Sequence, residues 1–310
     1  MKNYYKVTFE RKNRSKYADE CVNGSFVGIN GGIHSDLSNE LTEDWREFNH
    51  KFIPIYLTDN PDKSKIAAGL ACRSLWTIWK EISKGDILVC PNGRGVLLFG
   101  EVTGDYSYNP DAVLPDRRTV QWLSTTIKRS EVSEQLNKSI KLPGTLGLIT
   151  EHSEEIERYI AGNKISITEA THETIEDLSV FALEKHLEDF LVQNWKQTEL
   201  GKQYDIYEEE GELVGQQYPT DTGPIDILAI RKDKEEILVV ELKKGRASDS
   251  VVGQIQRYMG YVQEELAEEN QVVKGAIIAL EDDIRIRRAL SVARNIEFYR
   301  YQVSFKLFKG

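Results

Sequence analysis

The stretch GPIDILAIRKDKEEILVVELKKG, residues 223–245, contains two apolar runs joined by a charged turn. Both runs are rich in Ile, Leu and Val, which predicts two buried strands of a hairpin. A turn centred between Asp233 and Lys234 would set Asp226 directly opposite Glu241 in the antiparallel pair. The sequence therefore predicts two carboxylates side by side at the open end of an apolar hairpin.

Lys243 follows Glu241 by two positions, so both side chains point to one face of the strand, about 6–7 Å apart. Opposed carboxylates repel each other unless a cation lies between them, and a divalent metal with oxygen ligands is the natural solution. Lys243 would then orient a water molecule or neutralise phosphate charge. On its own, a Glu-x-Lys sequence is also typical of a solvated ion pair on a strand. Asp226 favours a metal site instead, because two like charges directly opposite each other destabilise a sheet.

Pro224-Ile225-Asp226 and Glu241-Leu242-Lys243 together resemble the signature of the PD-(D/E)XK nuclease superfamily. Within it, the run from residue 218 to residue 262 looks most like the C-terminal domain of the NucS (EndoMS) family and of Mrr-like restriction endonucleases. The resemblance covers roughly residues 178–300. It implies metal-dependent hydrolysis of a phosphodiester, with Asp226 and Glu241 holding Mg²⁺ or Mn²⁺ and Lys243 positioning the nucleophile.

The same resemblance implies further site residues. Glu184 lies where the first core helix of the family places an acid beside the metal, and Glu188, one turn on along the same face, is an open alternative. Gln254 and Tyr258 match a Q-x-x-x-Y helix that flanks the site in the family. For these four residues an exposed helix face is the alternative. Residues expected to contact DNA are Lys244, Arg246, Arg257 and Tyr258, with solvation as the alternative for the basic ones.

The order of elements in the second half predicts helix, three strands, helix, strand, helix and strand, a mixed sheet flanked by helices. The first half shows many short strand signals, among them FIPIYL at 52–57, a hairpin at 85–102, and helices at 63–82 and 129–136. We predict a two-domain α/β (α+β) protein. Its expected parts are a recognition domain at 1–158, a linker at 159–178 and an endonuclease domain at 179–310.

The segments at 84–111 and 116–123 resemble the small β-barrels, PUA-like and EVE-like, of modification-dependent restriction enzymes. Such barrels hold a flipped base between aromatic side chains. Phe26, Trp45 and Tyr106 are the candidates for base reading, because polar or Gly-rich surroundings suggest loops, although most such rings pack cores. Arg94 and Arg117 are candidates for phosphate contacts, with solvation of turns as the simpler alternative.

Composition narrows the class of protein. The 310 residues carry a formal net charge of -10 with a pI of about 5.2, which does not favour DNA binding by the whole surface. A bound metal or a local basic patch can invert that sign within one groove. Three scattered Cys and the lack of a signal sequence or an apolar span indicate a cytoplasmic protein without disulfides. GINGGIHSD lacks the ending of a phosphate-binding loop, so no nucleotide cofactor is expected.

These observations predict a Mg²⁺- or Mn²⁺-dependent endodeoxyribonuclease that acts on double-stranded DNA as a homodimer. Its role is expected in restriction or defence, because the first half does not resemble the single-strand-binding barrel of NucS. Two alternatives stay open. One is a mismatch- or structure-specific repair nuclease, and the other is a nucleic-acid-binding reader whose nuclease fold no longer cuts.

Overall fold

The protein divides into two compact units, Met1–Thr171 and His172–Gly310. The computed structural model describes residues 2–9, 13–38, 40, 42, 44–142, 144–162, 187–209 and 211–302. The last helix of the first unit, α5 (Ser153–Ile160), buries Tyr159 in the core of that unit. The first unit therefore continues beyond residue 158, where the sequence predicts its end.

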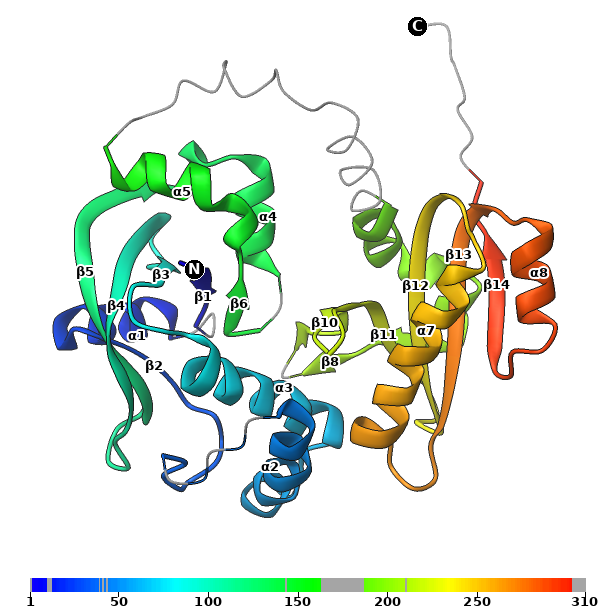
Figure 1. The fold of residues 1–310 in the computed structure, drawn as a ribbon, viewed down its shortest axis with the longest axis horizontal. Coiled ribbons are helices and arrows are strands. Elements are labelled where there is room, and N and C mark those ends of the chain that lie inside the picture. Colours follow the sequence, from blue (N-terminus) through cyan, green and yellow to red (C-terminus); the bar gives the residue numbers. More distant parts are fainter. Residues whose placement is uncertain are drawn as a thin grey trace, which may run out of the picture. The chain divides into compact units, whose positions relative to one another are not determined.

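A six-stranded sheet in the order β2-β5-β4-β3-β1-β6 forms the centre of the first unit (Figure 1). Strands β1 and β3 run parallel, and the other neighbours run antiparallel. The predicted hairpin at 85–102 is confirmed, with Gly93 at a φ of 74° in its turn. The strands are β1 (Tyr4–Val7), β2 (Phe26–Ile29), β3 (Ile87–Pro91), β4 (Val96–Tyr108), β5 (Asp116–Lys128) and β6 (Leu146–Leu148).

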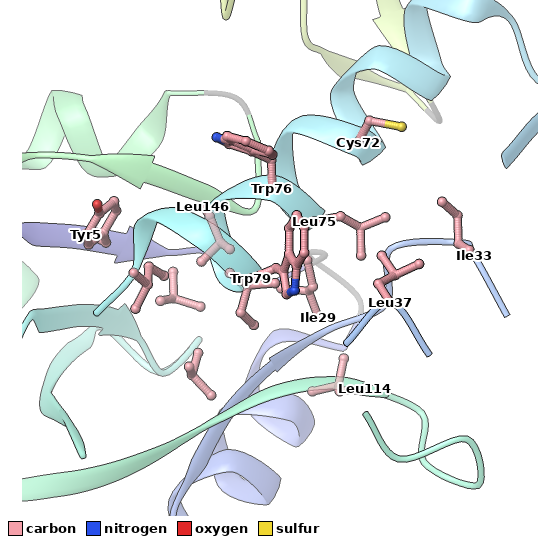
Figure 2. Close-up of a cluster of buried hydrophobic side chains, with 14 of the residues drawn as sticks. Tyr5, Ile29, Ile33, Leu37, Cys72, Leu75, Trp76, Trp79, Leu114 and Leu146 are labelled. Carbon is pink, nitrogen blue, oxygen red and sulfur yellow. The ribbon is translucent and has the colours of Figure 1, made fainter. Parts of the chain in front are cut away.

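Helices cover both faces of this sheet. Alternate residues of its strands enter different cores: Tyr5 and Leu88 join one hydrophobic cluster, and Tyr4 and Ile87 join another. Figure 2 shows part of the first cluster, to which α1, α2 and α3 contribute; α4 and α5 contribute to the second. The helical segments are α1 (Arg14–Gly24), α2 (Trp45–Asp59), α3 (Lys65–Trp76), η1 (Thr77–Glu81), η2 (Arg129–Glu131), α4 (Glu134–Lys141) and η3 (Thr150–His152).

The PUA/EVE-like barrel is not confirmed. Among the described residues the strand pairs form an open path that ends at β2 and β6. Each face buries its own set of side chains, whereas a barrel encloses one set inside.

The strand predicted at 52–57 is wrong, because these residues lie within helix α2. Asp44 caps this helix by accepting from the amides of residues 46 and 47. Its buried side chains recur at helical spacing from Trp45 through Phe48 and Phe52 to Tyr56. The short apolar run by itself has the composition of a strand, whereas the residues from Asp44 to Phe52 indicate a helix.

The second unit holds a mixed sheet in the order β10-β11-β12-β13-β14, with β7 also paired to β11. Strands β10, β11 and β12 are antiparallel neighbours, and β12, β13 and β14 are parallel ones. From residue 187 onward the two strands of the central hairpin and the later helix, strand, helix and strand agree with the predicted order, but the short strands β7 and β8 were not predicted. The strands are β7 (Tyr204–Ile206), β8 (Glu208–Glu209), β9 (Glu212–Leu213), β10 (Gln216–Tyr218), β11 (Ile225–Arg231), β12 (Glu236–Arg246), β13 (Val272–Glu281) and β14 (Ile296–Arg300).

Helices flank this sheet too (Figure 1). A helix runs through residues 187–193, and Trp195 and Leu200 after it join a core on one face of the sheet. The remaining helical segments are η4 (Trp195–Gln197), η5 (Leu200–Lys202), α7 (Ser250–Tyr261), η6 (Val262–Leu266) and α8 (Ile284–Leu290).

The register of the central hairpin is the one that the sequence predicts. Leu228 pairs with Val239 and Ile230 with Ile237. The alternate residues Ile227, Val240 and Leu242 enter the core cluster described above, so Asp226, Glu241 and Lys243 point to the other face. The hairpin thus has one apolar face and a second face whose open end carries charge.

Glu236 marks the opposite end of the same hairpin. Its carboxylate accepts from the hydroxyl of Tyr204 at 2.5 Å and pairs with Arg231 and Lys274, each at 2.9 Å. We expect Glu236→Gln to lower the free energy of unfolding by about 2 kcal/mol, because an amide nitrogen would then face these donors. Urea denaturation of the full chain measures the change, and an unaltered midpoint would contradict it.

Candidate active site

Asp226 lies in β11 at the open end of the hairpin. One oxygen, Oδ2, accepts from the backbone amide of Leu242 at 2.7 Å, and Oδ1 accepts from the side-chain amide of Gln217 at 3.2 Å. The bond to Leu242 ties the carboxylate to the neighbouring strand just beyond the last regular pair, Ile227 with Val240. Asp226 is therefore fixed beside the segment that carries Glu241.

Glu241 is buried in β12, with 2% of its surface exposed. Lys243 donates to its Oε1 at 2.7 Å, so the predicted pair on one face of the strand is confirmed. Burial of a carboxylate is costly unless it is paired, and here an ammonium group provides the charge. Continued by one position beyond Ile227 and Val240, the hairpin register would set Glu241 opposite Asp226, as the sequence predicts.

Glu188 is the acid that the structure places beside Asp226. It is 6% exposed and comes from the helix that runs through residues 187–193. Burial raises its pKa to about 7; the hydrogen bond from Gln216 opposes this rise, and the charge of Asp226 adds to it. Glu184, the other candidate acid, lies outside the described residues.

Two neighbouring amides that the sequence analysis missed surround Glu188. Gln216 donates to its Oε1 at 2.7 Å, and Gln217 donates to its Oε2 at 2.6 Å. The signal in the sequence is a pair of Gln in the strand before the one that carries Asp226, and such a pair has no distinctive pattern.

Gln254 and Tyr258 lie on α7 and contact each other, with 3.5 Å between the amide nitrogen and the hydroxyl oxygen. Tyr258 is buried, and a Cβ added to Gly223 would lie 3.2 Å from its hydroxyl oxygen. Gly223 has a φ of 122° and ends the turn before β11. Tyr258 thus supports the turn that leads to Asp226, whereas its predicted contact with DNA stays a prediction.

The donor types of this site fit a divalent ion. Glu188, Asp226 and Glu241 offer carboxylate oxygens, which Mg²⁺ and Mn²⁺ prefer. Within the described part of the chain, no three His, Cys, Asp or Glu side chains lie close enough to share one ion as they stand.

The basic residues predicted to contact DNA differ in their exposure and in their ion pairs. Arg246 pairs with Glu281 at 3.2 Å on the exposed end of β12, Lys244 is half-buried beside it, and Arg257 is exposed on α7. In the first unit, Arg94 forms a two-point pair with Asp19 at 2.8 and 2.6 Å. Their contacts with phosphate stay predictions.

Arg117 has three partners inside the first unit. Its guanidinium lies 3.9 Å from the centre of the Phe26 ring. It also donates to the carbonyl of Leu114 and pairs with Glu20. These contacts hold the side chain against β2, so a contact with DNA would compete with them.

The loop positions expected for the base-reading aromatics are wrong. Phe26 lies on β2, Tyr106 on β4, and Trp45 is the first residue of α2. Trp45 stacks on Phe48 at 6.0 Å and meets Trp76 edge-on at 5.7 Å. Loop-like surroundings in the sequence reflect the ends of these elements, and each ring packs within the unit. A role in base reading is not tested by this packing.

Asp116 is a buried acid that the sequence analysis did not single out. Tyr106 donates to its Oδ1 at 2.7 Å, and the amide of Gly31 donates to its Oδ2 at 3.3 Å. Burial raises the pKa of Asp116 from 3.8 to about 6 despite these bonds. The folded state therefore binds this proton more tightly than the unfolded state does.

The raised pKa of Asp116 predicts a pH-dependent stability. Its contribution is fully present below pH 3.8 and is lost as the pH rises through about 6. Relative to Asp116→Asn, the wild type should lose about 2 kcal/mol of unfolding free energy between pH 4 and 7. Denaturation followed by Trp fluorescence measures this, because four of the five Trp residues lie in the first unit. A difference that stays constant with pH would contradict it.

Two family models match the chain. Residues 184–306 match the model described as the Endonuclease NucS C-terminal domain, and residues 5–145 match a domain of unknown function, DUF8426. Comparison with the curated proteins gives no match.

Similar solved structures include a complex of EndoMS with double-stranded DNA, with 14% identity over 68% of this chain and 62% of that chain at a TM-score of 0.34. A repair endonuclease from Pyrococcus abyssi has 15% identity over 68% of this chain and 66% of that one, with a TM-score of 0.31. EndoMS in its apo form has 15% identity over 70% and 77%, with a TM-score of 0.30. This chain spans less than two thirds of the length of the first two.

The TM-scores of these three structures are too low for the structural similarity to carry an argument. The match to the family model is the more informative comparison. Its match confirms the predicted resemblance to NucS for the C-terminal unit and supports a nuclease. The predicted PUA/EVE-like resemblance of the first unit is not confirmed by the match to DUF8426. No helix in the described ranges is long and apolar enough to span a membrane.

Proposed function

We propose that this protein is a metal-dependent DNA endonuclease whose first unit directs it to modified or foreign DNA. The observation that carries the proposal is the open end of the β11–β12 hairpin, where Lys243 pairs with Glu241 and Asp226 accepts from the amide of Leu242, the residue between them. The match of residues 184–306 to the NucS C-terminal model supports it independently.

Asp226, Glu241 and Glu188 would hold Mg²⁺ or Mn²⁺. When bound, such an ion activates water at neutral pH and stabilises the charge that develops on the phosphate. Lys243 keeps an ammonium group beside Glu241, where it can donate to the attacking water or to a phosphate oxygen. Tyr258 and Gly223 hold the turn that fixes Asp226. Two copies of the chain would allow both strands of a duplex to be cut.

Restriction or defence is the favoured role, because the sequence of the first unit does not resemble the single-strand-binding barrel of NucS, and its residues 5–145 match DUF8426. A mismatch-specific repair role is the second candidate, and the NucS model itself favours it. The two roles share one chemistry and differ in what the first unit selects.

The test is incubation of the full chain with Mg²⁺ or Mn²⁺ and four plasmid substrates: unmodified, cytosine-methylated, hydroxymethylated and mismatched. Preferential cleavage of a modified plasmid is the expected result. Cleavage of the mismatched plasmid alone would assign the repair role. Failure to cut any substrate with either metal would overturn the proposed enzyme.

A further inference from the structure

One amide group bridges two carboxylates of the candidate site. The side-chain nitrogen of Gln217 donates to Oε2 of Glu188 at 2.6 Å and to Oδ1 of Asp226 at 3.2 Å. A carboxylate only accepts hydrogen bonds, so the NH₂ end of the amide must face both acids and its carbonyl must face away. Both hydrogens of Gln217 are thereby used on acids from two separate elements.

The backbone of Gln217 is adapted to this contact. Its φ is 51°, in the left-handed region that costs a residue other than Gly roughly 1 kcal/mol. In a regular strand, the side chains of Gln216 and Gln217 would point to opposite faces. The left-handed residue breaks that alternation, and both amides reach the same carboxylate, Glu188. Strain of this kind persists where the surroundings enforce it.

We propose that Gln217 is a positioning residue of the metal centre, an inference that rests on the proposed function. Its amide holds Glu188 and Asp226 side by side, although their charges repel. Because the amide is neutral, it leaves the negative charge of the acids available to a divalent ion, whereas an Arg or Lys at this position would cancel it. Loss of such a supporting hydrogen bond typically weakens metal binding by roughly 10–100-fold.

The test is a Mn²⁺ titration of the full chain without DNA, in which electron paramagnetic resonance measures the free ion. Gln217→Leu removes both hydrogen bonds and keeps a side chain at the left-handed position. Gln217→Gly removes the hydrogen bonds and also relieves the backbone. We expect the Kd for Mn²⁺ to rise at least tenfold in both variants, while Gln217→Gly unfolds at the same urea concentration as wild type or a higher one.

Two matched controls separate positioning from folding. Lys234 has a φ of 65° in the hairpin turn, so Lys234→Gly relieves the same kind of strain away from the site. It should leave the Kd for Mn²⁺ unchanged. Gln216→Leu removes one bond to Glu188 and leaves the Gln217 bond to Asp226 in place, since the side-chain amide of Gln216 donates to Glu188 and Asp189. Its Kd should rise less than that of Gln217→Leu.

The outcomes are distinguishable. Unchanged or tighter Mn²⁺ binding by both folded Gln217 variants would overturn the positioning role, and tighter binding would show that the amide competes with the ion. A loss of stability in Gln217→Gly without a change in Kd would assign Gln217 to the fold alone. Wild-type protein that takes up no more Mn²⁺ than Glu241→Gln would overturn the proposed function, and this inference with it.

Discussion

Glu241→Gln is expected to abolish cleavage of DNA while the protein stays folded. The substitution preserves the volume of the side chain and an oxygen that can accept from Lys243, which now contacts Oε1 at 2.7 Å. It removes the negative charge that would hold the ion. We expect the rate of plasmid nicking to fall at least a thousandfold, which corresponds to about 4 kcal/mol of transition-state stabilisation.

Glu236→Gln is the matched control for this experiment. Both glutamates are buried in β12, and each pairs with lysine, but Glu236 lies at the opposite end of the hairpin. The variant at position 236 should cut DNA at the wild-type rate under conditions where it is folded. Equal nicking by Glu241→Gln and wild type at saturating Mg²⁺ would remove Glu241 from the mechanism.

Glu188→Gln is expected to lower the nicking rate at least a hundredfold. Glu188 is buried against Gln216 and Gln217, and its pKa responds to the charge of Asp226. A neutral amide at this position cannot supply the negative ligand that the ion requires. The measurement is the initial rate of plasmid nicking over a series of Mn²⁺ concentrations, and the concentration for half-maximal rate should rise.

Glu184→Gln is the comparison that identifies the helix acid. The spacing of Glu184 and Glu188 in the sequence is that of one helical turn, so the sequence leaves both open. We expect the loss of activity to be at least tenfold smaller for Glu184→Gln than for Glu188→Gln. The reverse order would assign the role to Glu184 and leave Glu188 as a buried structural acid.

Much of the C-terminal site could be predicted because strand geometry is local. The charged turn at Asp233 and Lys234 fixes the pairing of β11 with β12, and every other position then follows at a spacing of two. Asp226, Glu241 and Lys243 share a face for this reason alone. The order of the later strands and helices could be predicted in the same way, because each apolar run has clear ends.

The first unit was harder to predict, because its signals depend on distant contacts. The apolar run at 52–57 has the composition of a strand, yet Asp44 begins a helix before it. Phe26 and Tyr106 have loop-like neighbours in the sequence but are held on strands by Arg117 and Asp116. Arg117, for example, is far from Phe26 in the sequence, so the residues around Phe26 do not predict this contact.

The sequence by itself determined the hairpin, its register and the two acids with a lysine at its end, since alternation along paired strands requires only neighbouring residues. Tertiary structure alone decided that Glu188 lies beside Asp226 and that Gln217 bridges them. These contacts bring together a helix and two strands. The contacts of Gln217 also depend on its left-handed backbone conformation, which the periodicity of the sequence does not predict. Backbone geometry set the first group, and packing of separate elements set the second.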